Sequence, residues 1–188
     1  MSQSELLTKL IATLNAADIP YMLTGSIVSS IQGEPRATHD IDVIVMIRTE
    51  DIPKLMAVFA LPAFLLDQDT IRDAIDNRTM FNLIDTFEGD KVDFWVLTSD
   101  PFDSSRFRRK SPIELLGLRT FISTPEDTIL AKLLWSKLSG GSEKQFGDAL
   151  RVYEVQFLKL DLCYLEEWIS ELQLEEYWQR LKNEAVVI

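Results

Sequence analysis

The 188-residue chain is poor in the residues that several common chemistries require. Its one cysteine, Cys163, excludes an internal disulfide and a cysteine-based zinc site, and we expect it to lie buried in a helix as a small apolar residue. Its one histidine, His39, argues against hydrolases built on a histidine triad. The longest apolar stretch, residues 57–66, contains a proline and is too short to span a membrane. No signal-peptide pattern opens the chain, so we expect a cytoplasmic protein with no membrane partner.

Positive charge is also scarce. The 19 lysines and arginines stand against 30 aspartates and glutamates, which gives a formal net charge of -11. Such a surface repels polyphosphate over most of its area, which argues against extended DNA binding and leaves room for a small phosphate site. The one basic cluster, residues 106–110, either steers a nucleic-acid acceptor or is ordinary solvated surface.

The hydrophobic pattern predicts a mixed α/β front part and a helical rear part. Strands are expected over residues 21–23, 40–47, 81–87, 91–97 and 118–122, and helices over residues 5–17, 27–31, 52–60 and 70–77. After Pro125 only helical spacing continues, with a break at Gly140-Gly141 and a third helix from Leu160-Asp161. We therefore predict an α+β protein with an α/β core over residues 1–122 and a helical C-terminal subdomain over residues 123–188 packed on that core.

Three aspartates stand in the predicted strands. Asp40 and Asp42 are two residues apart, so their side chains lie on one face of the strand. Two carboxylates side by side repel each other unless a cation lies between them, and oxygen ligands suit Mg²⁺ or Mn²⁺. Asp93 lies in another predicted strand. If the two strands are neighbours, Asp93 completes a cluster able to hold the metals of a phosphoryl-transfer site.

Residues just before this aspartate pair suit a phosphate. Gly25 and Ser26 end a strand and begin a helix, where free N–H groups and the positive end of the helix dipole attract anions. Arg36 and His39 lie in the loop before the pair and suit a triphosphate or a second substrate. Ordinary alternatives exist for each feature: a plain N-cap for Ser26, and a solvated strand edge or the metal-sugar-nucleotide motif of glycosyltransferases for the aspartate pair. The combination, in this order, favours nucleotide chemistry.

Together, the Gly25-Ser26 pair, the Asp40-X-Asp42 motif and the later Asp93 resemble the signature of the minimal nucleotidyltransferases of the DNA polymerase beta superfamily. The resemblance implies a nucleotidyltransferase-like mixed sheet flanked by helices, and metal-dependent transfer of a nucleotidyl group from a nucleoside triphosphate. It implies that Asp40 and Asp42 hold the metals and that Asp93 is a metal ligand or helps to activate the acceptor hydroxyl. Gly25 and Ser26 would hold the triphosphate.

Segments 123–133 and 142–148 resemble the AbiEii-type branch, the nucleotidyltransferase-like toxins of type IV toxin–antitoxin systems and their relatives. In that branch a helix lysine and a later aspartate complete the site, and Lys132 and Asp148 occupy the matching places. The helix around Lys132 is apolar nearly all round, so we expect this lysine to be largely buried. Ser136-Lys137 stands where toxins of this branch usually carry a further arginine.

The sequence therefore predicts a nucleotidyltransferase with Mg²⁺ or Mn²⁺ as cofactor and a nucleoside triphosphate as substrate. The acceptor is an RNA end, a protein or a small molecule, and an antitoxin partner is one form of the prediction. The alternative is a non-catalytic nucleotide-binding or interaction protein that keeps the fold. The predicted catalytic residues are Asp40, Asp42, Asp93, Lys132 and Asp148, the predicted metal ligands are Asp40, Asp42 and Asp93, and the predicted nucleotide-binding residues are Gly25, Ser26, Arg36 and Lys132.

Overall fold

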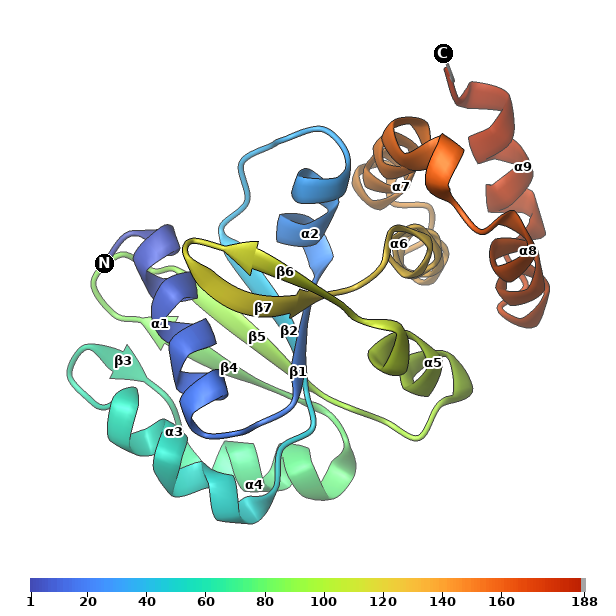
Figure 1. Cartoon of the computed structure of the whole chain (residues 1–188). Coiled ribbons are helices and arrows are strands. Elements are labelled where there is room, and N and C mark those ends of the chain that lie inside the picture. The colour runs from blue at the N-terminus through green and yellow to red at the C-terminus, as the bar shows by residue number, and fades with distance from the viewer. Residues whose placement is uncertain (187–188) are drawn as a thin grey trace. The chain divides into compact units, whose positions relative to one another are not determined.

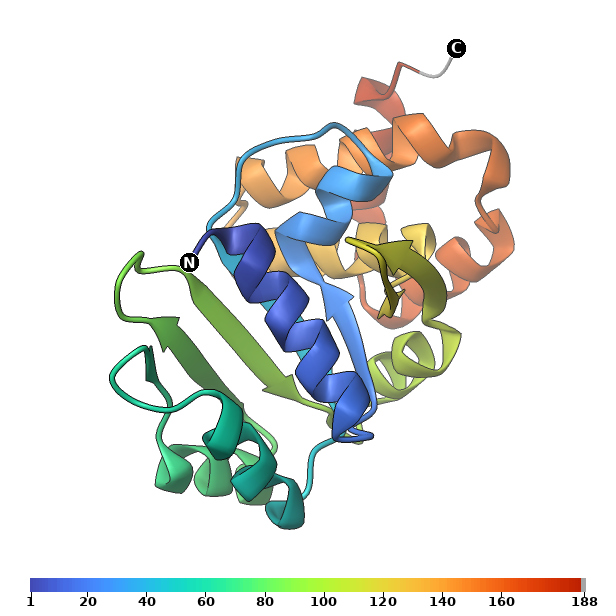
Figure 2. The same ribbon diagram turned by 60° about the vertical axis from the view of Figure 1, so that its left-hand side comes forward.

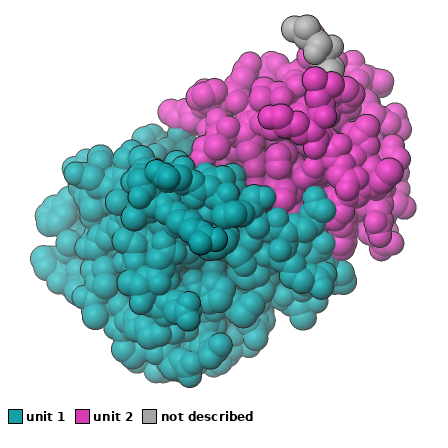
Figure 3. Space-filling model, viewed as in Figure 1, with its two compact units in different colours: residues 1–24, 38–122 teal, residues 25–37, 123–188 magenta. Residues whose placement is uncertain are grey.

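The computed structural model describes residues 1–186, which form two compact units (Figure 3). Unit 1 comprises residues 1–24 and 38–122, and unit 2 comprises residues 25–37 and the chain from Ser123 onward. The chain therefore passes from one unit to the other three times. The sequence suggests a single division after residue 122, which leaves residues 25–37 in the front part, whereas in the structure this segment groups with the rear helices.

Unit 1 contains the strands and the front helices (Figure 1). Its strands are β1 (Tyr21–Thr24), β2 (Asp40–Val45), β3 (Phe64–Leu65), β4 (Met80–Asp85), β5 (Lys91–Val96), β6 (Ser111–Leu115) and β7 (Leu118–Ile122). Its helices are α1 (Gln3–Ala16), α3 (Ile52–Val58), α4 (Gln68–Asn77) and α5 (Pro101–Arg109), with a 3₁₀ turn at Thr49–Asp51. The strands form one sheet in the order β3-β4-β5-β2-β1-β7-β6. The pairs β2–β5 and β1–β7 are parallel and the others antiparallel, which confirms the predicted mixed sheet.

One face of this sheet is the apolar core of unit 1. Residues that point to it alternate along the strands and are at most 3% exposed: Tyr21, Leu23, Ile41, Val43, Val45, Phe81, Leu83, Val92, Phe94 and Val96. Helix α1 lies across this face, where the Tyr21 hydroxyl donates to Asn15 of α1 (Figure 2). The N-terminus of α1 is stabilised by a capping box between Ser2 and Glu5.

The opposite face divides into an apolar part and a polar part. Met22 and Ile44 are register neighbours there, and Phe107 of α5 packs on them. Further along the same face the neighbours are Asp42 and Asp93. Helix α5 therefore covers one end of the face, and the predicted metal ligands lie at the other end.

Unit 2 is helical within its described residues. Its helices are α2 (Gly25–Gln32), α6 (Pro125–Leu138), α7 (Glu143–Gln156), α8 (Leu162–Glu171) and α9 (Glu175–Glu184), with a 3₁₀ turn at Phe157–Lys159. The Gln32 side chain donates to the Ser123 carbonyl at 2.7 Å, and the Gln156 side chain donates to the Gln32 carbonyl at 2.7 Å. A Cβ atom added to Gly33 would lie 2.9 Å from the backbone nitrogen of Val152. Only glycine allows this close approach of the segment after α2 to α7.

Some elements differ from the sequence prediction. Strands β3 and β6, helix α5 and the fourth rear helix were not predicted. Helix α5 is rich in charge and buries only Phe102 and Phe107, so it lacks a continuous apolar stripe. Cys163 is exposed on α8, so the prediction that it is buried is wrong: its helix buries Leu165 and Ile169 on another face. No helix within residues 1–186 is long and apolar enough to cross a membrane.

Candidate functional site

The three predicted metal ligands lie together on neighbouring strands of unit 1. Asp42 of β2 is the register neighbour of Asp93 of β5, and Asp40 is the register neighbour of Lys91. Because residues two apart on a strand share a face, all four side chains project from the same side of the sheet. The condition set by the sequence, that the two strands be neighbours, is met.

Basic and amide groups already contact these carboxylates. Lys91 Nζ lies 2.9 Å from Asp93 Oδ2 and 3.8 Å from Asp40 Oδ1. Asn82, the register neighbour of Asp93 on β4, donates a short hydrogen bond to Asp93 Oδ1. The hydrogen bond with Asp93 raises the pKa of Lys91, and the nearby charge of Asp40 raises it further. Lys91 is therefore a protonated member of the cluster at neutral pH.

The donor atoms of the cluster suit a hard divalent cation, since all are carboxylate oxygens. Their positions do not converge on one point: within residues 1–186 no group of three or more Asp, Glu, His or Cys side chains stands close enough together to hold a metal. Asp40 is exposed and Asp93 is 8% exposed, so the two differ in their contact with solvent. Asp93 points toward Lys91 and Asn82, and a shared metal requires its side chain to turn away from them.

A second cluster lies in unit 2 around Asp148 of α7. The Asp148 carboxylate accepts hydrogen bonds from Arg36 Nε and Nη2, both at 2.7 Å, and pairs with Lys132 Nζ at 2.7 Å. Ser26 Oγ accepts a hydrogen bond from Arg36 Nη2 at 2.8 Å and lies 3.4 Å from Lys132 Nζ. Four of the predicted site residues therefore form one network. Gly25 precedes Ser26 as the first residue of α2 and adopts a φ of 68°, a conformation that favours glycine.

Two cations, Arg36 and Lys132, contact the one carboxylate of Asp148 in this network. Burial alone raises the pKa of Asp148, but the hydrogen bonds from Arg36 and Lys132 outweigh burial and hold that pKa below its usual range. The hydrogen bonds with Asp148 raise the pKa of Arg36. Asp148 is therefore ionised and Arg36 protonated at neutral pH.

Lys132 is 4% exposed, which confirms the predicted burial. Thr128 and Ser136 lie one turn before and after it on α6 and are equally buried, at 2% and 1% exposure. Thr128 Oγ1 lies 2.7 Å from Ser123 Oγ, and the Ser136 hydroxyl donates to the Ser142 carbonyl at 3.0 Å. The three polar side chains on this face of α6, Thr128, Lys132 and Ser136, are therefore buried against protein rather than exposed to water.

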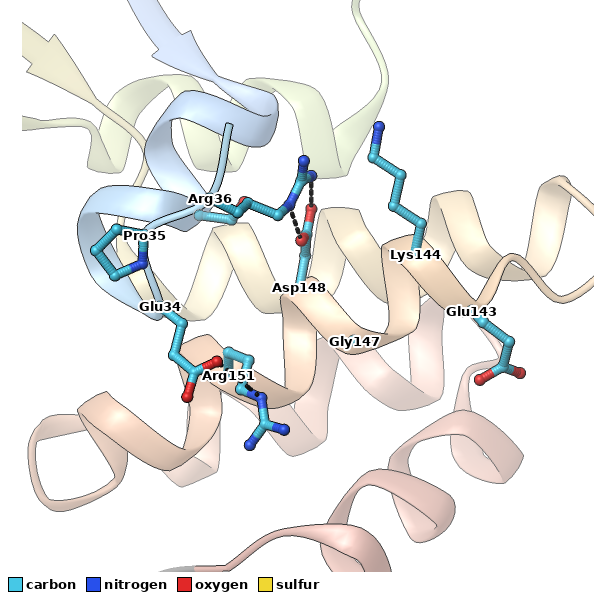
Figure 4. A pocket seen from close by; sticks show the side chains of 9 residues that line it. Glu34, Pro35, Arg36, Glu143, Lys144, Gly147, Asp148 and Arg151 are labelled. Carbon is cyan, nitrogen blue, oxygen red and sulfur yellow. Dashed lines mark hydrogen bonds and ion pairs between the residues drawn. The ribbon is translucent and has the colours of Figure 1, made fainter. Parts of the chain in front are cut away.

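A pocket of about 280 Å³ opens beside this network in unit 2 (Figure 4). Helix α7 supplies one wall, and the segment around Arg36 supplies the other. The Arg36 guanidinium and the Lys144 ammonium point to the same side of α7 (Figure 4). Gly147 lies between Lys144 and Asp148, and a Cβ atom added there would meet nothing within 4 Å. Arg151, at the other end, pairs with Glu34 at 3.4 Å and with Glu154 at 2.6 Å.

Residue by residue, the predicted site divides into two sets. Asp40, Asp42 and Asp93 belong to unit 1. The second set, in unit 2, is Gly25, Ser26, Arg36, Lys132 and Asp148. His39 joins neither set: its side chain is 91% exposed and lies 3.9 Å from Asp90.

Sequence reasoning missed Lys91 and Asn82. The signal for Lys91 was present, because it precedes Asp93 by two residues and so shares its face of the strand. Asn82 could not be found in this way, because only the pairing of β4 with β5 places it beside Asp93. Two residues of the basic cluster at the end of α5 contact neighbouring side chains. Arg106 lies 2.6 Å from Asp103, and Lys110 Nζ lies 3.8 Å from the centre of the Phe107 ring.

Comparison with known proteins supports the fold. No family model matches the chain, and no curated protein matches it. A nucleotidyltransferase-like protein from Paracoccidioides brasiliensis is 13% identical with a TM-score of 0.55, and the match covers 98% of this chain and 94% of that one. The structure of ANT(2'')-Ia in complex with adenylyl-2''-tobramycin is 12% identical with a TM-score of 0.60, and the match covers 94% of this chain and 99% of that one. The chain therefore has a nucleotidyltransferase-like fold, as predicted. The AbiEii-type branch stays a prediction.

Proposed function

We propose that this protein transfers a nucleoside monophosphate from a nucleoside triphosphate to a hydroxyl acceptor. The observation that carries the proposal is the placement of Asp40, Asp42 and Asp93 on one face of two neighbouring parallel strands. A sheet of this fold with three carboxylates on one face of neighbouring strands suits phosphoryl chemistry, in which positioning and charge do most of the catalytic work.

In the proposed reaction the acceptor oxygen attacks the α-phosphorus and forms a new oxygen–phosphorus bond. The bond to the β-phosphate breaks, and pyrophosphate leaves. The proton of the acceptor hydroxyl passes to Asp93, whose carboxylate keeps free lone pairs after its contacts with Asn82 and Lys91. A divalent cation held by Asp40 and Asp42, and by Asp93 once its side chain turns from Lys91 and Asn82, would neutralise phosphate charge and polarise the reacting oxygens.

The cluster of unit 2 suits the triphosphate. Arg36 and Lys132 share the single negative charge of Asp148, and a triphosphate offers them more negative charge than one carboxylate does. Gly25 and Ser26 begin α2 and present its N-terminus, where backbone N–H groups favour phosphate.

The net charge of the protein narrows the class of acceptor that we propose. A net charge of -11 disfavours a long nucleic-acid footprint, so we propose a small molecule or a short RNA end, with a protein side chain as the third candidate. The toxin–antitoxin form of the proposal rests only on the sequence resemblance of segments 123–133 and 142–148.

One observation favours a second candidate, a nucleotide-binding protein without turnover. Asp93, the proposed base, is contacted on one oxygen by Lys91 and on the other by Asn82, so neither oxygen is free to approach an acceptor hydroxyl without competition. A protein of this kind binds the triphosphate through Arg36 and Lys132 but releases no pyrophosphate.

The experiment compares the wild type with the double variant Asp40→Asn/Asp42→Asn. Calorimetry with each nucleoside triphosphate and Mg²⁺ measures binding, and α-³²P-labelled triphosphates measure transfer to RNA, protein and aminoglycosides. The last are offered because ANT(2'')-Ia was solved with adenylyl-2''-tobramycin. We expect transfer by the wild type and a loss of roughly 100-fold or more in the variant, the scale that removing electrostatic stabilisation of a transition state costs.

The matched control is Asp69→Asn/Asp73→Asn, which removes two exposed carboxylates of α4 and should leave transfer unchanged. Binding without transfer to any acceptor would favour the second candidate. Absence of both binding and transfer in the wild type would contradict the proposal.

A further inference from the structure

Lys91 lies among the carboxylates that we propose as metal ligands, and its position suggests a role for it. We propose that Lys91 is a built-in counter-ion of this cluster, which keeps Asp93 from a free divalent cation until a nucleotide arrives with its metal. The inference rests on the proposed function for the identity of the metal site. The contacts of Lys91 with Asp40 and Asp93 do not depend on the proposed function.

The geometry favours a bridging role for this side chain. Lys91 stands opposite Asp40 across the β2–β5 pair and two residues before Asp93 on its own strand. Its ammonium therefore reaches a carboxylate on each strand, at 3.8 Å from Asp40 and 2.9 Å from Asp93. Asn82 holds the other oxygen of Asp93 from β4. Both carboxylate oxygens of Asp93 are therefore in contact with other side chains. Asp93 would have to break these contacts in order to bind a metal.

The charge balance explains why a lysine is tolerated at this position. Three carboxylates on one sheet face repel one another, and a cation among them lowers that repulsion. A protonated lysine supplies one positive charge permanently, whereas a divalent cation supplies two only when it is bound. A free divalent cation must therefore displace the ammonium from Asp93, and it loses part of its binding energy in doing so.

The consequence is an order of loading. A metal that arrives with a triphosphate brings phosphate oxygens as further ligands, so it needs fewer ligands from the protein at first. We therefore expect weak binding of the free metal and stronger binding of the metal with nucleotide.

The experiment measures free Mn²⁺ by electron paramagnetic resonance as protein is added, without nucleotide. We expect Lys91→Met to bind Mn²⁺ about two- to fivefold more tightly than the wild type, the equivalent of one half-exposed ion pair. Lys91→Arg keeps the charge and should bind as weakly as the wild type. The matched control is Lys54→Met, because Lys54 is also half-exposed and pairs at 2.7 Å with Asp51, whose exposure equals that of Asp93.

Equal Mn²⁺ affinity in Lys91→Met and Lys54→Met would overturn the inference, and so would equal gains in Lys91→Met and Lys91→Arg. Lys91→Gln serves as a second neutral variant if the methionine variant does not fold. Adding Asp40→Asn/Asp42→Asn to Lys91→Met should remove the gain, and a gain that persists would place the metal elsewhere. Failure of the proposed function is a separate result, because it appears as absence of triphosphate binding in the wild type.

Discussion

Each unit of the protein places a lysine ammonium against an aspartate, but in opposite charge settings. In unit 2, Lys132 and Arg36 together surround the single carboxylate of Asp148, and the Lys132 side chain is 5% exposed. In unit 1, Lys91 contacts two of the three carboxylates, Asp40 and Asp93, and its side chain is 36% exposed. The first cluster is buried and brings two cations to one carboxylate, whereas the second is partly exposed and brings one lysine to two carboxylates. We propose that the same pair of residue types serves an anion in one unit and a cation in the other.

The largest expected effect comes from removing the carboxylate of unit 2. Asp148→Asn removes the carboxylate charge that the buried Lys132 and Arg36 both contact, and we expect a loss of about 3–5 kcal/mol in the free energy of unfolding. Urea unfolding followed by tryptophan fluorescence measures it, because three of the four tryptophans lie in unit 2. The control Glu154→Gln on the same helix loosens a half-exposed pair with Arg151 and should cost about 1 kcal/mol or less. Equal losses of stability in the two variants would contradict the expectation that the buried Lys132–Asp148 pair contributes more than the Arg151–Glu154 pair.

The next effect concerns the backbone contact that holds residues 25–37 in unit 2. Gly33→Ala places a methyl group 2.9 Å from the Val152 nitrogen, and we expect a loss of about 1–3 kcal/mol from overpacking. Gly147→Ala is the matched control, since its methyl group meets nothing within 4 Å and alanine favours a helix interior by about 0.5–1 kcal/mol. The two substitutions should therefore change the urea midpoint in opposite directions. A shift of the same sign in both would contradict the close approach of Gly33 to α7.

A smaller effect is expected from pH. The folded-state pKa of Asp148 is lower than its unfolded value, so its ionised form stabilises the folded state at every pH above the ordinary aspartate range. The difference in stability between the wild type and Asp148→Asn should stay constant from neutral pH down to about pH 5. It should then shrink as the pH falls through the lowered pKa and Asp148 becomes protonated. A difference that shrinks between pH 8 and pH 6 instead would assign the stabilisation to another group.

The smallest effect on stability is expected in unit 1. Lys91→Met breaks a half-exposed pair, removes a cation from an acidic cluster, and should change the free energy of unfolding by about 1 kcal/mol or less. Hydrogen exchange of the β2 and β5 amides measures this locally. A loss as large as that of Asp148→Asn would mean that Lys91 is structural, as Lys132 is.

Part of this picture could be predicted from the sequence. The alternation of β2, with Ile41, Val43 and Val45 facing the core, is enough by itself to place Asp40 and Asp42 on the other face. The apolar surroundings of Lys132 likewise predict its burial. Both predictions rest on periodicity within one element, which a sequence displays directly.

Contacts between distant elements could not be predicted in the same way. The pairing of Asn82 with Asp93 depends on the register of β4 against β5, and the grouping of residues 25–37 with unit 2 depends on Gly33 meeting α7. Helix α5 was not predicted because it buries only two residues and is otherwise rich in arginine, so its sequence shows no continuous apolar stripe. The roles of the site residues remain predictions for the experiments above.

Because the chain crosses between the two units three times, each unit is built from two separate segments of the sequence. Cutting the chain after Ile122 would separate α2 from α6 and α7, which belong with it to unit 2. A fragment of residues 1–122 would keep strands β1 to β7 but lose the Ser123 carbonyl to which Gln32 donates and the stretch of α7 that Gly33 approaches. The helical part could not have been appended to an already complete sheet domain without the segment 25–37 changing its packing.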